Sequence, residues 1–214
     1  MVRIIIFGAP GSGRSTYGNL LSSKLNVDVI DTGNVLREII LRDTPLGRRV
    51  KEYVDDGLLV PNDVVFRVLI QLIDEKQEKG FILDGYPRTL EQAMTLDCIT
   101  KIDAVIHLVA PDWLLTERMI NRRVCTKCKA IYNLLLQKVD KCTECGGQLV
   151  QRTDDTHEAI QRRLASFYEQ EKPILQYFRR KGIPIITLKT TKRESNPKSD
   201  VEKLFSSLKS LQLA

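Results

Sequence analysis

The sequence has no hydrophobic run long enough to cross a bilayer, which argues against an integral membrane protein. It also has no basic tail, no internal repeat and no Ser-His-Asp pattern that would activate a serine nucleophile. The first residues lack the layout of a secretory signal peptide, because their short apolar run leads directly into a glycine-rich segment. We therefore expect a cytoplasmic protein with no membrane partner.

Aromatic residues are scarce, at 6% of 214 residues, and are not interleaved with basic side chains as in single-stranded nucleic-acid binders. The hydrophobic content of 43% and the charged content of 28% are ordinary for a globular chain. The length allows one sizeable core, or one core with a small insert. A net charge of +6 favours polyanionic ligands such as nucleotides, although the mixture of both signs also fits a solvated surface.

One motif dominates the N-terminal region. The apolar run Ile4–Phe7 leads into Gly8-Ala9-Pro10-Gly11-Ser12-Gly13-Arg14-Ser15-Thr16, which has the spacing of a phosphate-binding P-loop. Such a loop needs glycine because backbone N–H groups must approach the phosphates closely, and the following helix adds its positive dipole. Arg14 stands where the motif has Lys, and a planar guanidinium is not equivalent to an ammonium at a tight site. The alternative is a plain glycine-rich turn.

Short β-branched runs recur at long intervals along the chain, with helical periodicity between them. Strands are expected at Val2–Phe7, Val27–Ile30, Phe81–Leu83, Ala104–Val109 and Ile183–Leu188. Helices are expected at Ser15–Leu25, Val35–Arg42, Leu46–Asp56, Asn62–Lys79, Thr89–Cys98, Trp113–Arg123, Asp155–Lys181 and Asp200–Leu211. This alternation predicts an α/β protein with a parallel sheet and right-handed crossovers. Pro173 is expected to bend or split its helix near residue 172.

The segment from about 124 to 152 breaks this pattern and indicates a small inserted domain. It holds two pairs of cysteines, Cys125-x2-Cys128 and Cys142-x2-Cys145, whose four thiolates suit a tetrahedral Zn²⁺ site. Four protein ligands leave no open position, so the metal would be structural. Iron could use the same ligands, and two disulfides are a further alternative that a reducing compartment disfavours. Cys98 lies apart and is expected to be a buried small hydrophobe.

Asp84 follows the expected strand Phe81–Leu83 and would face the crevice at the carboxyl edge of the sheet. Beside a P-loop it can hold Mg²⁺ through water, although Asp-Gly is also a common turn. Several arginines border the candidate ligand segments and could neutralise a transferring phosphoryl group. They are Arg37, Arg88, Arg118, Arg122, Arg152 and Arg163.

Together these segments resemble the adenylate kinases, in the form with a zinc-bearing lid, from residue 1 to about 190. Residues 8–16 resemble the P-loop, and Phe81–Ala93 is the most specific match. The other matching segments are Asp31–Arg37 and Gly57–Pro61 at the AMP site, Glu117–Val124 leading into the lid and Gln151–Asp155 leading out of it.

The resemblance implies a P-loop kinase fold with a five-stranded parallel sheet in the order 2-3-1-4-5. The core would comprise residues 1–30, 61–122 and 157–214, with an AMP-binding helical insert at 31–60 and a zinc lid at 123–156. The implied reaction is the reversible, Mg²⁺-dependent transfer of the γ-phosphoryl group of ATP to AMP, which gives two ADP.

The resemblance also implies a role for individual residues. Donor ATP would be bound by Gly11, Ser12, Gly13, Arg14, Ser15, Thr16, Arg118, Arg122, Ile131, Tyr132 and Lys192. AMP would be bound by Thr32, Arg37, Leu58, Leu59, Val60, Gly85, Tyr86, Arg88, Gln92, Arg152 and Arg163, with Gln92 reading the adenine edge. The catalytic charges would be Arg14, Arg88, Arg122, Arg152 and Arg163.

Three residues depart from the family pattern: Arg14, Ser15 and Asn34 replace its usual Lys, Gly and Asp. The late proline-containing segment that borders the ATP base is not recognisable, and Lys192 is placed in that region. Two other functions are therefore considered. One is a monophosphate kinase whose donor is GTP or another triphosphate. The other is a catalytically weakened P-loop and zinc-knuckle protein that binds nucleotide or RNA.

Overall fold

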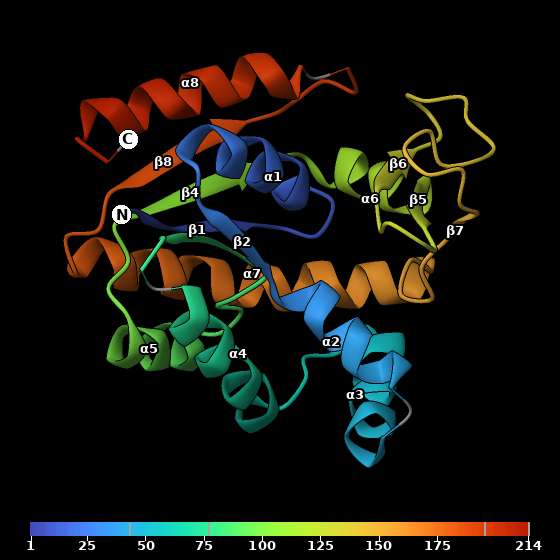
Figure 1. Cartoon of the computed structure of the whole chain (residues 1–214), viewed down its shortest axis with the longest axis horizontal. Coiled ribbons are helices and arrows are strands. Elements are labelled where there is room, and N and C mark those ends of the chain that lie inside the picture. The colour runs from blue at the N-terminus through green and yellow to red at the C-terminus, as the bar shows by residue number, and fades with distance from the viewer. Residues whose placement is uncertain (43, 77, 195, 214) are drawn as a thin grey trace.

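The computed structural model describes residues 1–42, 44–76, 78–194 and 196–213. Its centre is a five-stranded parallel sheet (Figure 1). The strands lie in the order β2 (Asp28–Asp31), β3 (Phe81–Asp84), β1 (Arg3–Gly8), β4 (Ala104–Val109) and β8 (Ile185–Lys189). The predicted α/β class and the strand order 2-3-1-4-5 are confirmed.

Strand β1 shows why the apolar runs form buried strands. Ile5 and Phe7 belong to the core on one face of the sheet, and Ile4 and Ile6 to the core on the other. Alternate side chains of a strand point to opposite faces, so a strand covered on both faces is apolar throughout.

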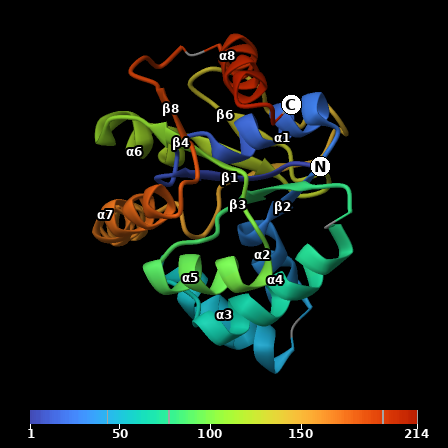
Figure 2. The ribbon, with the colours of Figure 1, turned by 90° about the vertical axis from the view of Figure 1, so that its left-hand side faces the viewer.

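Helices cover both faces of the sheet (Figure 2). Helices α1 (Arg14–Leu25) and α8 (Pro197–Ser210) pack on one face through Leu21 and Leu204. Helices α4 (Asn62–Lys76), α5 (Leu90–Ile99) and α7 (His157–Arg180) pack on the other. No helix in the described ranges is both long and apolar enough to cross a membrane.

Two short helices, α2 (Thr32–Leu41) and α3 (Pro45–Asp55), project from the carboxyl edge of the sheet as a pair (Figure 1). Each begins at a side chain that satisfies a free backbone N–H of its first turn. Asp31 accepts a hydrogen bond from the N–H of Asn34 at 2.9 Å, and Thr44 accepts one from the N–H of Gly47 at 3.0 Å.

Helix α6 (Asp112–Ile120) leads into a second, antiparallel sheet in the order β6-β5-β7. Its strands are β5 (Arg122–Cys125), β6 (Ile131–Asn133) and β7 (Leu149–Val150). The sequence did not predict them, because two to four residues with mixed exposure give no clear alternation.

The prediction for Cys98 is wrong, and of the two outcomes expected at Pro173 the split does not occur. Helix α7 runs unbroken from His157 to Arg180 with Pro173 inside it. Ile174 and Phe178 are buried in the core just beyond the proline, and this packing outweighs the backbone hydrogen bond that proline cannot donate. Cys98 is exposed rather than buried, because α5 buries the opposite side, through Ala93 and Leu96.

Candidate functional site

The glycine-rich loop joins the carboxyl end of β1 to α1. Strand β3 lies on one side of β1 and β4 on the other, so the order of strand addition changes side here. Gly11 and Gly13 have positive φ angles of 83° and 97°, and a Cβ on Gly11 would lie 2.7 Å from the carbonyl oxygen of Leu115. Gly13 precedes α1 and offers no capping side chain, so the N–H groups of the first turn can receive an anion. The buried Ser12 Oγ has no hydrogen-bond partner within the described chain.

Arg14 and Ser15 both contact Asp84 at the end of β3. Arg14 Nε lies 2.8 Å from Asp84 Oδ1, and Arg14 Nη1 donates to the carbonyl oxygen of Gly8. Ser15 Oγ donates to Asp84 Oδ2 at 2.6 Å. A hydroxyl and a carboxylate side by side are hard oxygen ligands, and a hydroxyl at the Ser15 position of a P-loop binds Mg²⁺. The residues present therefore fit a magnesium ion.

Between the P-loop and the small sheet lies a cavity of about 380 Å³, which we call the donor cavity. Its lining includes Gly11, Gly13, Arg14, Ser15, Thr16, Tyr17, Arg118, Arg122, Ile131, Tyr132, Asn133 and Pro197. Lys192 is exposed and does not belong to this lining. From the C-terminal part of the chain, Pro197 lines the cavity instead. Its only sequence signal is a proline near the start of the last helix.

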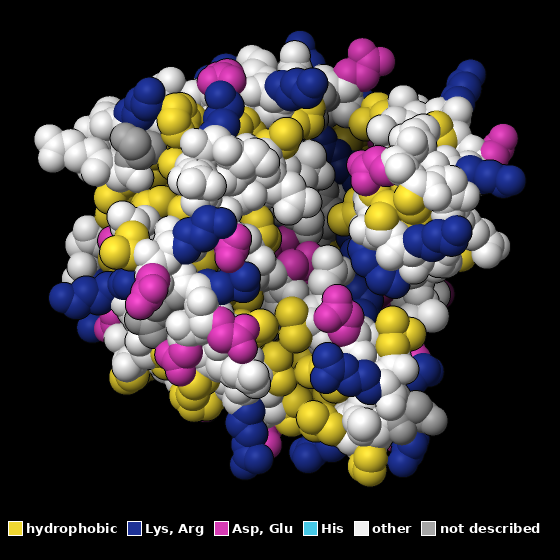
Figure 3. All heavy atoms as spheres, in the orientation of Figure 1, with side chains coloured by type: hydrophobic (Ala, Val, Ile, Leu, Met, Phe, Trp, Pro, Cys, Tyr) yellow, Lys and Arg dark blue, Asp and Glu magenta, His cyan; other side chains and the backbone are white. Residues whose placement is uncertain are grey.

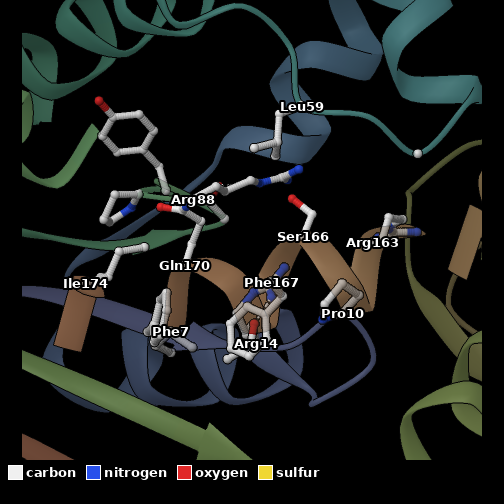
Figure 4. A pocket seen from close by; sticks show the side chains of 16 residues that line it. Phe7, Pro10, Arg14, Leu59, Arg88, Arg163, Ser166, Phe167, Gln170 and Ile174 are labelled. Carbon is white, nitrogen blue, oxygen red and sulfur yellow. Dashed lines mark hydrogen bonds between the residues drawn. The ribbon is translucent and has the colours of Figure 1, made fainter. Parts of the chain in front are cut away.

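A more enclosed cavity of about 60 Å³ lies on the other side of the P-loop, and we call it the acceptor cavity (Figure 4). It is lined by Arg14, Gly57, Leu59, Gly85, Tyr86, Arg88, Arg163, Ser166, Phe167, Gln170 and Ile174, among others. A neighbouring hollow of about 40 Å³ shares Gly57, Arg88 and Arg163 and adds Gly33, Arg37, Leu58, Val60 and Asp154. Arg14 lines both the donor and the acceptor cavity.

Two predicted acceptor residues lie behind this lining. Thr32 donates its hydroxyl to the carbonyl oxygen of Asp84 at 2.9 Å. Gln92 is only 3% exposed, accepts from the N–H of Arg88 at 2.7 Å and donates to Asn62 Oδ1 at 2.7 Å. Both residues thus brace the loop that carries Arg88.

Gly57 lies where the segment after α3 meets α7. Its φ is +69°, and a Cβ at this position would lie 2.9 Å from the carbonyl oxygen of Ala159. Near it, Thr153 Oγ1 donates to Asp55 Oδ1 at 2.8 Å, and Arg162 Nε donates to the carbonyl oxygen of Asp56 at 2.7 Å.

The arginines are held by two buried carboxylates. Asp155 receives Arg122 in a bidentate contact, at 2.8 and 2.5 Å, and Asp154 Oδ2 lies 2.8 Å from Arg163 Nη1. Paired this way, the guanidinium groups are held in fixed orientations, and their remaining N–H groups can donate to an anion. Arg37 Nη2 instead donates to Asn34 Oδ1 at 2.8 Å.

Positive charge exceeds negative charge at this site. Burial, followed by the charges of neighbouring arginines, lowers the pKa of Arg88 to about 10. The same causes lower the pKa of Arg152 to about 9, and its buried Nε has no partner in the described ranges. Both groups are still charged at neutral pH, and an anion bound close to either would offset the repulsion from its neighbouring arginines.

The four cysteine sulfurs of the small sheet lie within 4.8 Å of one another. Cys125 and Cys145 are 3.5 Å apart and Cys128 and Cys142 are 3.4 Å apart, too far for a disulfide bond. A Cβ on Gly147 would lie 2.6 Å from the Cys125 sulfur, so the backbone wraps closely around the cluster. Four clustered thiols fit a tetrahedral Zn²⁺ ion.

Tyr132 connects this cluster to the donor cavity, which it also lines. Its hydroxyl lies 3.3 Å from the Cys142 sulfur. This contact is the main cause that lowers the pKa of the Cys142 thiol, to about 6. A thiolate at neutral pH is the form that binds metal.

A phosphate-binding loop at the turning point of a doubly wound sheet, with an arginine-lined cavity on either side, brings two phosphorylated ligands together. Fold and site thus define a P-loop phosphotransferase that acts on small nucleotides.

Comparison with known proteins narrows this class. The family model described as adenylate kinase matches residues 6–183. An adenylate kinase of Archaeoglobus fulgidus is 38% identical over 218 residues, covering 98% of this chain and 100% of that protein. One of Caldicellulosiruptor bescii is 39% identical over 194 residues, covering 86% of this chain and 90% of that protein. The chain belongs to the adenylate kinase family.

Proposed function

We propose that the donor cavity holds ATP and the acceptor cavity holds AMP in the reaction that this chain catalyses as an adenylate kinase, ATP + AMP giving two ADP. One observation carries the assignment: Arg14 of the P-loop lines both cavities. A phosphoryl group that passes from one cavity to the other moves past this guanidinium.

Three parts of the chain divide the work. The core comprises residues 1–30, 61–122 and 157–214, residues 31–60 close over AMP, and residues 123–156 close over ATP. Closure excludes water, which would otherwise compete with AMP for the phosphoryl group. The contacts between Asp55 and Thr153 and between Asp56 and Arg162 support this division, because they join the parts where they meet.

The residues of the donor cavity would bind the triphosphate. The backbone from Gly11 to Thr16 faces the phosphates, and Arg118 and Arg122 approach from α6 and β5. Magnesium would be held by the Ser15 hydroxyl and, through water, by Asp84, and it would neutralise charge on the β- and γ-phosphates. Ile131, Tyr132 and Pro197 would border the donor nucleoside, with Lys192 outside the first layer of contacts.

In the acceptor cavity, Arg88 and Arg163 would bind the phosphate of AMP, with Arg37 in the adjoining hollow and Arg152 behind it. Leu58, Leu59, Val60, Gly85 and Tyr86 would enclose the nucleoside. Thr32 and Gln92 would act through the loop that they brace. The enzyme forms no covalent intermediate, because fixed cations and alignment supply what phosphoryl transfer needs.

The cysteine cluster would hold one structural Zn²⁺, with iron as the competing metal. Cysteines that hold a metal must stay unoxidised, which suits a reducing compartment, and we therefore propose a cytoplasmic location.

A coupled assay that follows ADP formed from ATP and AMP tests this proposal. Replacing ATP by GTP in the same assay decides the donor base. Binding of labelled RNA in a filter assay, with no ADP formed, would instead support the weakened nucleotide- or RNA-binding alternative.

A further inference from the structure

Tyr17, near the start of α1, directly follows the residues that the phosphate-binding motif specifies. It lines the donor cavity, whose lining also includes Gly13 and Pro197. Figure 3 shows the surface hollowed between α1 and the small sheet. The residue is only 3% exposed and belongs to the core that α1 and α8 share with the central sheet. Tyr17 is therefore a core residue that also meets the cavity.

The ring of Tyr17 packs against the end of the glycine-rich loop. A Cβ on Gly13 would lie 3.2 Å from Cε2 and 3.3 Å from Cδ2 of Tyr17, so the ring lies directly beside this backbone. The Tyr17 N–H also donates to the carbonyl oxygen of Gly13 at 3.0 Å. The end of the loop, and with it the first N–H groups of α1, is thus held by this one residue.

The hydroxyl of Tyr17 reaches a different part of the chain. It donates to Asp200 Oδ2 at 3.1 Å, in the first turn of α8. Burial raises the pKa of Tyr17 above its ordinary value of 10.0, so the hydroxyl keeps its proton for this bond at neutral pH. Thr190, which follows β8, is a second polar neighbour of the hydroxyl. The hydroxyl therefore joins α1 to the beginning of α8.

Helix α8 begins at Pro197, which lines the donor cavity. Tyr17 therefore connects the phosphate loop, through its ring, with the start of α8, through its hydroxyl. We propose that Tyr17 is a positioning residue for the donor nucleotide. It sets the spacing between the loop that binds the phosphates and the residue that borders the nucleoside. The inference rests on the proposed assignment of this cavity to ATP.

Removal of the hydroxyl alone separates this role from general support of the fold. Leu21 of α1 and Leu204 of α8 are buried in the same core, so the two helices stay packed without the hydrogen bond. Tyr17→Phe is therefore expected to fold and to keep its ring on Gly13, while the start of α8 loses its link to α1. The affinity for the nucleoside should fall, and the affinity for the phosphates should not.

Three further variants complete the test. Asp200→Ala removes the acceptor of the same bond, and Asp200→Asn keeps a polar partner for the hydroxyl whichever way its amide faces. Tyr177→Phe is the matched control, because the Tyr177 hydroxyl also joins two helices, α7 and α5, by donating to Asp97 Oδ2 at 3.0 Å. Tyr177 does not belong to the lining of the donor cavity.

The ligands are the magnesium complexes of β,γ-methylene-ATP and of inorganic tripolyphosphate, which has three phosphates and no nucleoside. Calorimetry measures both affinities with AMP at saturation, so that neither ligand enters the acceptor cavity. We expect Tyr17→Phe and Asp200→Ala to bind β,γ-methylene-ATP about fivefold more weakly, as one lost hydrogen bond implies, and to bind tripolyphosphate as the unmodified protein does. Asp200→Asn and Tyr177→Phe should bind both ligands with unchanged affinity.

Two results would overturn the inference: Tyr17→Phe binding both ligands with unchanged affinity, or losing affinity for both by the same factor. An equal loss in Tyr177→Phe would show a general loosening of helix packing and would also reject it. Each result leaves the proposed function intact as long as the unmodified protein forms ADP from ATP and AMP. Failure of that assay would reject the function itself.

Discussion

Arg14 Nε lies 2.8 Å from Asp84 Oδ1, so a charged pair spans the P-loop and the end of the neighbouring strand. Ser15 holds the other oxygen of the same carboxylate at 2.6 Å. The two departures from the family's usual Lys and Gly thus meet at one side chain. The same guanidinium lines both cavities, which keeps it beside the proposed path of the phosphoryl group.

Replacing Arg14 should test its charge. Arg14→Ala is expected to lower kcat by about 10²–10³-fold, because a cation that stabilises the transition state is lost. Arg14→Lys should be far milder, and Arg67→Ala, at an exposed position, serves as the control. Steady-state rates of ADP formation measure the effect. Unchanged turnover in Arg14→Ala would show that this residue plays no part in the chemistry.

Replacing Asp84 should change the magnesium requirement. Asp84→Asn keeps the size of the side chain but removes the charge that would orient water around Mg²⁺. We expect the magnesium concentration for half-maximal rate to rise by about 10–100-fold. Calorimetric titration of Mg²⁺ into the protein with ATP bound gives a second readout. Equal magnesium dependence in both proteins would remove Asp84 from the metal site.

Metal at the cysteine cluster should stabilise the small sheet. We expect about one Zn²⁺ per chain by elemental analysis, since binding energy at such a site contributes to folding. Cys142→Ser should lower the Tm clearly, whereas the rate measured at low temperature should change little. Cys98→Ser, outside the cluster and exposed, should leave the Tm unchanged. Metal-free protein with two disulfides would reject the zinc site.

Removing Gln92 should weaken AMP binding through Arg88. Gln92→Ala deprives the Arg88 N–H and Asn62 of their partner, and we expect the KM for AMP to rise by about tenfold. Because Gln92 does not line the cavity, the KM for UMP should rise by the same factor. A loss confined to AMP would mean that Gln92 itself reads the base.

The Asp154 carboxyl should make stability depend on pH. Burial opposes its ionisation, but the charge of Arg163, followed by those of Arg122, Arg37 and Arg152, holds its pKa below the usual value of 3.8. A depressed pKa stabilises the fold above the unfolded pKa, and this contribution is lost as pH falls toward the folded pKa.

Asp154→Asn should therefore cost about 2 kcal/mol of unfolding free energy at pH 7, and the difference from the unmodified protein should shrink below about pH 4. Urea unfolding between pH 3 and pH 7 measures this, with the exposed Asp140→Asn as control. A constant difference across that range would contradict the pKa direction.

Local chemistry made much of this molecule predictable. Three features could be interpreted from a few neighbouring residues each. They are the glycine spacing around Arg14, the carboxylate of Asp84 after a buried strand, and the paired cysteines. The central strands β1, β3 and β4 were predictable because burial on both faces gives nearly unbroken apolar runs. The edge strands β2 and β8 are only partly buried and were predicted from their short β-branched segments.

Contacts between segments that are far apart in the sequence were not predictable. Pro197 reaches the donor cavity, and Ser166 and Gln170 reach the acceptor cavity, only after the helices pack, and none of them belongs to a spaced motif. The strands of the small sheet were not predicted, for a related reason. These strands are short and show no apolar pattern, and the clustered cysteines lie at and between their ends.

Because Gly57 has no side chain, the segment after α3 can lie close to α7. Main chain meets main chain where the segment after α3 passes α7, and a single methyl group would occupy the space 2.9 Å from the Ala159 oxygen. Any larger residue would push these two segments apart and widen the cavity proposed for AMP, which Gly57 lines, and water would then have access to the phosphoryl group during the proposed transfer.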